Sequence, residues 1–588
     1  MKKLTLALVA VLLVAGLIAA TSPWRIPRAV VAQALEAGLP RSSGLHASLA
    51  GPATFKLLPR PRVQATQLTV GDDGGAVMLD TPLLKADLDI PSLARGVWRL
   101  TSATLVGPTA TLDLDHMVAP ILTEQGEHPS LQIRLRSGVL RLRSTTGPGD
   151  LLATGLDASV TWPGDSEAVV LSGVATVKGA TARFAGALQN PALSMTPEGS
   201  NATLQVDSSL FSLAVDGILS GGPQQTFSGR ASLSTSALPK LLRHLDGIPL
   251  AVAAKRAQIS GDLVAKLHDL SLSNAQVRLD RARFEGTLAW RRDAGRSLVA
   301  GTLATDLLDL DALFGDGADR RAFEDLYRRP LVASPFGTDI DMRISATTAR
   351  LQRVTVEDAA IAALVRGDRL ELILDEARAY RGLVKARLLA NIGADGIDAH
   401  AELSAKSVDL GALSEGLSGH ERVGGALTGQ TELDGRGASL LDVVSKLEGS
   451  GQIGIEGGRL AGLSLAQALR HLGRRIPLVA DSRGTPTTFD KALWAVSIKD
   501  GVVRIPDGKL TAPGVSMSFG AETNLPAGRI DVQAVAAQTD RGGAKLPDGQ
   551  SLPFEMRGTW AGPLVLEAKS AGLPLTAFPL FDGFAAQR

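Results

Sequence analysis

The feature that most constrains the fold of this chain is an alternation of apolar and polar residues that recurs along most of its 588 residues. From Leu84 to Ile90 every second residue is apolar, and the residues between them are Lys or Asp. Side chains of a β-strand point alternately to its two faces, so this pattern predicts strands with one apolar and one polar face. Gly, Pro, Asp or Asn usually separates the runs, which predicts a long antiparallel sheet. The other runs are Ala110–Leu114, Leu131–Leu135, Phe211–Val215, Val277–Leu279, Ile340–Ile344, Leu370–Leu374, Trp494–Ile498, Val515–Phe519, Ile530–Ala534 and Leu564–Ala568.

The alternation changes parity at Ser137–Gly138, which predicts a turn that joins two antiparallel strands. Four arginines should then share the polar face of this hairpin. One interpretation is an ordinary solvated face. The other is a patch that binds anionic headgroups or lipopolysaccharide phosphates. These arginines are Arg134, Arg136, Arg141 and Arg143.

A few segments have helical rather than period-two spacing, so the predicted fold class is mainly β with a few short helices. Serines stand at the starts of several of these segments, where a side-chain oxygen can cap the first turn. The predicted helices are Pro27–Gly38, Ser236–Leu245, Asp306–Arg329 (split near Gly315 and Gly317), Ser439–Leu447 and Ser464–Leu472.

The N-terminus predicts export of the chain out of the cytoplasm. Lys2–Lys3 precede an apolar run, Leu4–Ala20, whose length lies between that of a cleaved signal and that of a membrane-spanning helix. Ala19–Ser22 could be a cleavage site, whereas Trp24–Arg25 resembles the interfacial end of a retained helix. We favour a retained transmembrane anchor over residues 1–22. In both cases the rest of the chain lies outside the cytoplasm.

The composition excludes several classes of function. Lys+Arg and Asp+Glu nearly cancel, at 61 and 60, so no overall field attracts nucleic acid. The chain has no cysteine, which excludes disulfides, thiolate metal sites and a thiol nucleophile. Only 2 Tyr and 6 Trp are present, too few for the aromatic girdles of an outer-membrane barrel.

Motifs that resemble catalytic or binding sites have simpler explanations. Gly449–Gly454 matches GxGxxG by letter, but it follows a predicted helix and precedes a predicted strand, the reverse of a dinucleotide site. The eight histidines are scattered, and the acidic cluster at Asp309–Asp319 lacks the ligand order of a calcium loop. No GxSxG elbow occurs. We therefore predict no catalytic residue, metal or cofactor, and no enzymatic activity.

Five segments together resemble the AsmA family of bacterial inner-membrane-anchored envelope proteins. The pattern of strand, glycine turn, helix and strand near the C-terminus carries most of the resemblance, whereas residues 126–430 are similar only in their β character. The resemblance divides the chain into residues 1–22 (anchor), 23–125 (N-terminal β region), 126–430 (central sheet with helical insertions), 431–570 (C-terminal region) and 571–588 (tail). The five segments are Gly51–Asp73, Leu84–Asp115, Leu447–Leu469, Thr487–Ile505 and Pro553–Pro563.

The resemblance implies a long curved sheet, shaped as a trough, whose apolar face carries phospholipid between the envelope membranes. The expected partners are membrane lipids, namely phospholipid and lipopolysaccharide, with envelope or outer-membrane assembly proteins as further candidates and no nucleic acid. A closed sandwich would have the same alternation. The alternative function is a scaffold or regulator of outer-membrane protein assembly that carries no lipid. The residues predicted to line the groove are Leu112, Leu114, Ile133, Leu135, Ile340, Met342, Ile344, Leu372, Val496 and Ile498.

Overall fold

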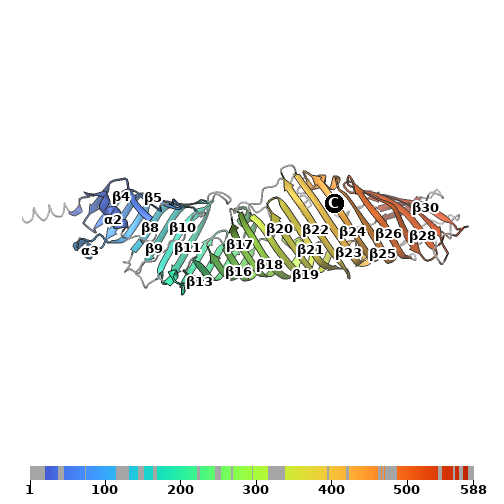
Figure 1. Ribbon diagram of the computed structural model, residues 1–588, viewed down its shortest axis with the longest axis horizontal. Helices are drawn as coiled ribbons and strands as arrows, with labels where there is room; N and C mark the ends of the chain where they lie inside the picture. Colours follow the sequence, from blue (N-terminus) through green and yellow to red (C-terminus); the bar gives the residue numbers. More distant parts are fainter. Residues whose placement is uncertain are drawn as a thin grey trace, which may run out of the picture. The chain divides into compact units, whose positions relative to one another are not determined.

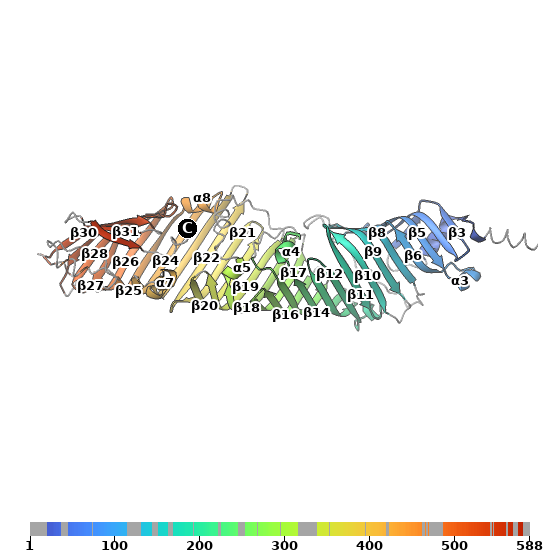
Figure 2. The same ribbon diagram turned by 180° about the vertical axis from the view of Figure 1, so that it is seen from behind.

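The structure, a computed structural model, describes residues 20–579 of the chain except for a set of segments. Its strands and helices divide into two compact units, which are described separately (Figures 1 and 2). Unit 1 consists of Met1–Leu250, Lys255–Asp280 and Glu285–Leu298, and unit 2 of Ala251–Ala254, Arg281–Phe284 and Val299–Arg588. The residues within 20–579 that the structure does not describe are 37–44, 73, 114–130, 144–150, 163–167, 192, 222–224, 245–252, 267–268, 294–295, 315–337, 352, 394–395, 419–420, 422, 461–464, 466–468, 470–485, 541–543, 545, 548, 560–562 and 569–573.

Unit 1 is a twisted sheet in which most strands pair with their neighbours in the chain. From β8 to β16 each strand pairs antiparallel with the next strand in the chain, as the alternation predicts. At the N-terminal end β4 pairs with β2, β3 and β5, and β1 extends β3. The strands are β1 Trp24–Ile26, β2 Leu45–Leu49, β3 Ala53–Lys56, β4 Arg62–Asp72, β5 Val77–Leu88, β6 Leu100–Val106, β7 Thr109–Asp113, β8 Leu131–Arg143, β9 Leu151–Trp162, β10 Val169–Val177, β11 Ala180–Leu188, β12 Ser200–Ser208, β13 Ser212–Ser220, β14 Thr226–Thr235, β15 Ala257–Lys266 and β16 Asp269–Leu279.

The predicted sheet, predominantly antiparallel, departs from that pattern at β8, which pairs in parallel with β6 and β7. Strands β6 and β7 both pair with β5 and are separated at Gly107–Pro108. Parallel strands need a long crossover connection, and the segment 114–130 between β7 and β8 has sufficient length for one. The alternation could not reveal this, because it is the same in parallel and antiparallel pairs when only one face is apolar.

The predicted hairpin at Ser137–Gly138 is also wrong, because β8 is one strand with a β-bulge there. Leu135 lies opposite Ala158 and Gly138 lies opposite Leu156, so β8 has one residue more than β9. Ser137 takes up the extra length with a φ of 53°, and its N–H donates to Oδ1 of Asp157 at 2.8 Å. A bulge shifts the parity of a strand while its apolar residues stay on the same face.

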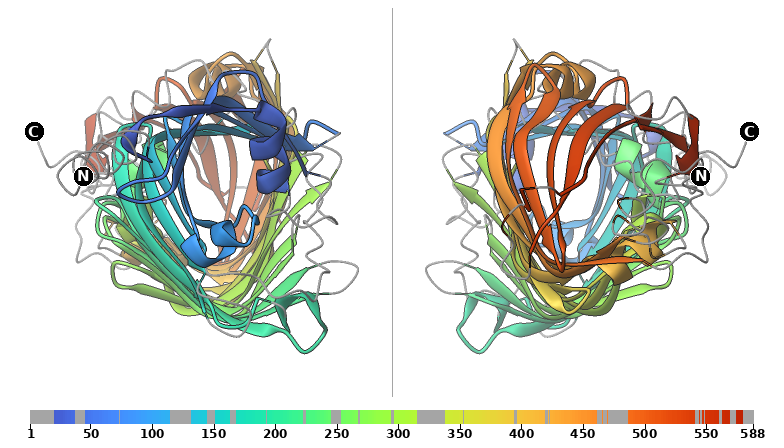
Figure 3. Two further views of the ribbon diagram at one scale, coloured as in Figure 1. Left: turned by 90° about the vertical axis from the view of Figure 1, so that its left-hand side faces the viewer. Right: turned by 90° about the vertical axis from the view of Figure 1, so that its right-hand side faces the viewer.

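In unit 2 the pairings from β19 to β32 are antiparallel and sequential. Its strands curve rather than lie flat, as the orange and red strands in Figure 3 show. Strands β17 Ala282–Asp293 and β18 Arg296–Asp309 contain residues of both units. The other strands are β19 Thr338–Leu351, β20 Val354–Arg366, β21 Arg369–Ala379, β22 Gly382–Gly393, β23 Gly396–Asp409, β24 Val423–Gly437, β25 Glu448–Leu460, β26 Thr487–Lys499, β27 Val502–Ala512, β28 Val515–Asn524, β29 Arg529–Gln538, β30 Ser551–Thr559, β31 Pro563–Ala568 and β32 Pro574–Pro579.

Short helices occur mainly between strands, which confirms the predicted fold class of mainly β structure with few helices. Ser439 caps α8, since its side chain accepts from Asp442 N–H and the Asp442 carboxylate accepts from Ser439 N–H, both at 3.1 Å. The predicted helix start at Asp306 is wrong: Asp306 lies in β18 and the helix begins at Leu310. The helices are α2 Arg28–Glu36, α3 Ile90–Ala94, the 3-10 turn η2 Leu193–Met195, α4 Leu238–His244, α5 Leu310–Phe314, α7 Leu410–Ser418 and α8 Leu440–Ser445.

The predicted anchor lies almost entirely outside the described residues, which begin at Ala20. Within the part of the chain that the structure describes, no helix combines the length and the apolarity needed to cross a membrane.

The glycines of β25 are strand residues, as predicted, and two of them should differ sharply in their tolerance of alanine. A Cβ at Gly458 would lie 2.0 Å from Cζ of Phe489, whose ring covers this glycine from β26. A Cβ at Gly454 would meet nothing closer than Leu493 Cδ1 at 3.4 Å. We expect Gly458→Ala to lower the free energy of unfolding by about 1–3 kcal/mol, as overpacking does, and Gly454→Ala to leave it nearly unchanged. Denaturant unfolding of both variants checks this, and equal stabilities would contradict it.

Candidate functional site: the apolar faces of the central strands

In unit 2, apolar residues of eight successive strands lie directly opposite one another in rows that cross the sheet. Each row runs from β19 to β26 through backbone-paired positions, so all its side chains point to the same face. With about 4.8 Å between neighbouring strands, a row is roughly 34 Å long. One row is Met342, Ala363, Leu372, Leu388, Ala401, Leu433, Gly449 and Ile498, and the next is Ile344, Ile361, Leu374, Ala386, Leu403, Thr431, Gly451 and Val496.

Among the residues of unit 2 that the structure describes, no second layer covers the middle of these rows. Leu372 is 38% exposed and Leu403 is 44% exposed, although both lie on central strands of the sheet. In a β-sandwich, side chains on the inner face interdigitate with those of the facing sheet and are almost fully buried. The half-exposed leucines therefore mark an open apolar face among the described residues of unit 2.

Unit 1 has the same arrangement on β9 to β16. Its rows begin at Ile133 and Leu135 on β8 and continue through paired positions, with Leu204 38% exposed near the middle. Several positions are glycine or alanine, so the apolar face is shallow rather than filled by large side chains. One row is Ile133, Val160, Leu171, Gly186, Leu204, Val215, Ala231 and Gly261, and the other is Leu135, Ala158, Gly173, Phe184, Val206, Leu213, Leu233, Ile259 and Val277.

At the N-terminal end of unit 1 the apolar face is closed by helix α2. Val31 of α2 is 4% exposed and packs in one cluster with Ala65 of β4 and Leu84 of β5, which are 0% and 1% exposed. Ile133 and Leu135 lie at the border of this cluster. The first strands of the sheet thus have a packed core, and the open face begins beyond β8.

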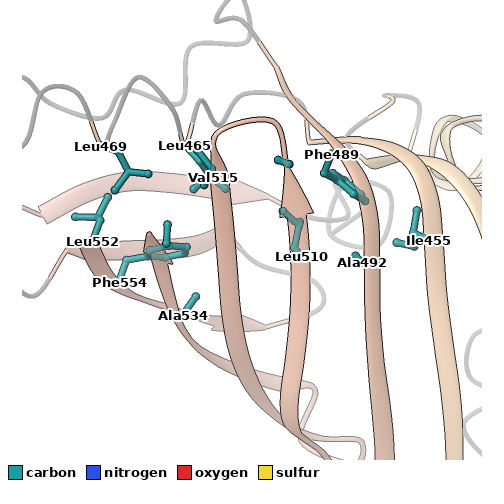
Figure 4. Close-up of a cluster of buried hydrophobic side chains, with 12 residues drawn as sticks. Ile455, Leu465, Leu469, Phe489, Ala492, Leu510, Val515, Ala534, Leu552 and Phe554 are labelled. Carbon is teal, nitrogen blue, oxygen red and sulfur yellow. The ribbon is translucent and has the colours of Figure 1, made fainter. Parts of the chain in front are cut away.

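The strands at the C-terminal end of unit 2 also have a packed core. Leu465 and Leu469, the described residues of the predicted helix Ser464–Leu472, are helical and almost completely buried. They pack against side chains of β26 to β30, among them Phe489 and Phe554 (Figure 4). The Thr487 hydroxyl accepts a hydrogen bond from Leu465 N–H at 2.9 Å.

Helix α8 covers one edge of the open face of unit 2. Val443 of α8 is 8% exposed and packs with Ala390 of β22 and Ile397 of β23, and with Leu370 on the row next to Leu372. The open part of the face in unit 2 is therefore limited to the middle of the strands.

The structure places the predicted groove residues on these faces unevenly. Met342, Leu372 and Ile498 share one row, and Ile344 and Val496 share the next. Ile340 lies one position further along the same face, opposite Val365. In unit 1, Ile133 and Leu135 begin the two rows, and Leu112 of β7 pairs beside Leu142 of β8. Leu114 lies outside the described residues. Val496 is 8% exposed, so it belongs to the covered part of the face.

Sequence reasoning missed the residues that are most exposed on the open face, Leu204 and Leu403, together with Leu388. Leu204 and Leu403 lie in runs with only one or two large apolar residues among small and polar ones, and Leu388 is followed directly by Leu389, so the alternation is weak at all three. Their place on the face follows from register with neighbouring strands, which a single strand cannot show.

The opposite faces of both sheets carry charged side chains. In unit 2, Arg387 Nη2 donates to Oε1 of Glu371 at 2.7 Å, from one strand to the next. In unit 1 this face of the single strand β8 carries Arg134, Arg136, Arg141 and Arg143. The bulge at Ser137 keeps the arginines before and after it on the same face. The predicted arginine patch is thus a row along one strand rather than the face of a hairpin.

Depressions of about 760 and 630 Å3 lie over the middle strands, one in each unit, and their linings include Leu204 and Leu403 of the apolar rows beside charged residues. The first has a floor of short side chains, including Ala185, Ala214 and Ser232, and Asp216 and Arg230 at its side. A twisted sheet is saddle-shaped, so a hollow can form on either face. Polar and apolar residues both line these depressions.

His400, on the polar face of β23, should titrate above its ordinary pKa. Its Nδ1 lies 2.8 Å from Oδ1 of Asp434 and its Nε2 3.4 Å from Oε1 of Glu402, and hydrogen bonds to these carboxylates raise the pKa of His400 above 6.5. Since the folded pKa exceeds the unfolded value, the stabilisation is complete below about pH 6.5 and is lost as pH rises through the folded pKa.

We expect Asp434→Asn to lower the pKa of His400, because it removes the larger cause of the shift. The effect on stability should be small, since the ring is partly exposed to solvent. An NMR titration of the histidine ring checks the prediction, and an unchanged pKa in the variant would contradict it.

In the described part of the chain, no group of three or more His, Asp or Glu side chains could hold a metal ion. What the geometry offers in each unit, among the described residues, is an apolar face that is partly open and adjoins a packed end, while the opposite face carries charged side chains. These features define a class of protein with a single-layer β-sheet that presents an apolar surface. The chain belongs to the AsmA family, whose model matches residues 147–508.

The family match overlaps the resemblance found in the sequence only at Leu447–Leu469 and Thr487–Ile505 and includes most of the central region that resembles the family only in β character. It does not include Gly51–Asp73 or Leu84–Asp115. A search of curated proteins found no match to this chain.

Proposed function

We propose that this protein is anchored in the inner membrane and supports outer-membrane biogenesis by carrying phospholipid along its apolar faces. The observation that carries the proposal is the half-exposure of Leu204, Leu372 and Leu403 on rows that cross several strands. Leucines in water lose the free energy that burial provides, so a ligand that covers them is stabilised.

Acyl chains fit this surface in size and chemistry. An acyl chain of roughly fifteen methylenes gains about 12 kcal/mol when it leaves water, at ~0.8 kcal/mol per methylene. An acyl chain spans half of a hydrocarbon layer that is about 30 Å thick. Its length is therefore less than that of a row in unit 2, which is roughly 34 Å. Ala and Gly at many row positions leave space above the sheet for such a ligand.

The cellular location in the proposal follows from the N-terminus and the family. Leu4–Ala20 is the proposed anchor, and the bulk of the chain lies in the periplasm. Mass spectrometry of the mature protein tests the anchor, since a chain that begins near Ala20–Pro23 would show that it is cleaved.

The arginines of β8 have a separate role in the proposal. Because Arg134 and Arg136 lie on the opposite face of the sheet from Ile133 and Leu135, they do not contact the carried acyl chains. They would bind anionic headgroups of a membrane or lipopolysaccharide phosphates from outside. Replacement of both by glutamine should therefore leave the amount of bound phospholipid unchanged.

The direct test is the lipid content of the full-length protein purified from membranes in a mild detergent. We expect phospholipid to remain bound after exchange into lipid-free detergent, at a constant ratio to protein, as measured by mass spectrometry. Protein that is folded but free of lipid would favour the alternative, a scaffold or regulator of outer-membrane protein assembly.

A further inference from the structure

The β3–β4 turn of unit 1 lies against the end of the proposed anchor. The N–H groups of Leu57 and Leu58 both donate to the carbonyl oxygen of Ala20, at 3.1 and 2.9 Å. Ala20 is the last residue of the apolar run that begins at Leu4. The turn is thus tied by its backbone to the point where the chain would leave the membrane.

The apolar side chains of this region are exposed, although the core of unit 1 is close to them. Leu57 and Leu58 are 45% and 39% exposed, and Trp24 is 57% exposed. Trp24 pairs with Phe55 of β3, only two residues before Leu57. Tryptophan is enriched at the boundary between lipid and water, and adjacent exposed leucines in a turn are costly unless something covers them.

Basic residues lie next to these apolar residues in the sequence. Arg25, Lys56 and Arg60 are all exposed. Arg62 differs, because its Nε donates to Oδ1 of Asp87 at 2.6 Å. From Ala20 to Gly71 the sequence has a single acidic residue, Glu36. A basic, apolar surface next to a membrane segment is complementary to anionic phospholipid headgroups.

We propose that the β3–β4 turn and Trp24 form a second membrane contact, in which Leu57 and Leu58 insert among the lipids while Lys56 and Arg60 bind anionic headgroups. The inference rests on the inner-membrane anchor of the proposed function. The turn would hold unit 1 against the membrane surface beside the anchor.

The absence of cysteine makes a site-specific test possible, since each introduced cysteine is the only thiol in the chain. Full-length Leu58→Cys would be labelled with an environment-sensitive fluorophore and reconstituted into vesicles of phosphatidylcholine alone or with phosphatidylglycerol. The matched control is Thr203→Cys, an exposed position on the polar face of β12. Flotation of the vesicles reports the anchor independently of the label.

We expect the label at position 58 to shift its emission to the blue and to be quenched by lipid-attached quenchers, more strongly in vesicles with phosphatidylglycerol. The label at position 203 should stay in water. Lys56→Gln with Arg60→Gln should reduce the quenching at position 58 without affecting flotation.

Three results would overturn the proposal. Protein that floats with a water-exposed label at position 58 would show that the anchor holds and the turn does not insert. Equal quenching with and without phosphatidylglycerol would show that Lys56 and Arg60 do not bind anionic headgroups. Protein that does not float would exclude both the anchor and the contact. None of these results depends on whether the apolar faces carry lipid, which the lipid content of the same protein reports separately.

Discussion

Protein with both Leu372→Asp and Leu403→Asp should fold and purify with at least tenfold less bound phospholipid than the unaltered chain. Both side chains are more than a third exposed, so the aspartates remain in contact with water in the empty protein. The cost should be about 1–2 kcal/mol of unfolding free energy per substitution, from lost partial burial and the poor strand propensity of aspartate. An acyl chain would bury the charges, which costs several kcal/mol, and each 1.4 kcal/mol reduces affinity about tenfold.

The matched control is Ser404→Asp, which adds the same charge to β23 next to Leu403 but on the opposite face. We expect this variant to keep its phospholipid. Circular dichroism and thermal unfolding establish that each variant is folded, and mass spectrometry measures the lipid. If the double variant unfolds, the face is covered as in a sandwich. If it is folded and retains its lipid, the lipid binds elsewhere.

Leu84→Ala should destabilise unit 1 by about 2–5 kcal/mol, whereas Leu403→Ala should cost unit 2 about 1 kcal/mol. Leu84 is 1% exposed in the cluster closed by helix α2, and its truncation leaves a cavity in addition to the lost transfer free energy. Leu403 is 44% exposed, so its truncation leaves no enclosed cavity. The same chemical change thus measures whether the face is covered.

Denaturant unfolding with a probe in each unit is the appropriate measurement, because two units need not unfold together. Lipid must be removed first, since a ligand bound to the native state raises its apparent stability. Similar large losses of unfolding free energy at both positions would show that the central strands are packed like the N-terminal ones. The inference of an open face would then be wrong.

The strands themselves were predictable from the sequence. The run Ile340–Ile344 and the run Leu370–Leu374 both form strands, and both turn their apolar residues to one face. This success has a simple cause, because the two-residue period of a strand is a local property. Ser439 as a helix cap was equally predictable, since a cap depends on residues within one turn.

The pairing of the strands and the coverage of their apolar faces were harder to predict from the sequence. The parallel pairing of β8 with β6 depends on a long connection, and the bulge at Ser137 mimics a turn in the sequence because both shift the parity. The exposure of Leu403 could not be predicted, whereas membership of the AsmA family could, because the family pattern is contained in short segments.

The sequence by itself determined that this chain forms strands with one apolar and one charged face, because alternation sets the direction of each side chain relative to its own backbone. Only the tertiary structure decided which parts of the apolar faces are covered. Leu84 and Leu403 both occupy apolar strand positions, yet helix α2 buries the face around Leu84, while Leu403 remains open to solvent. Burial depends on what packs above a strand, and a neighbour from a distant part of the chain leaves no trace in the period of the strand that it covers.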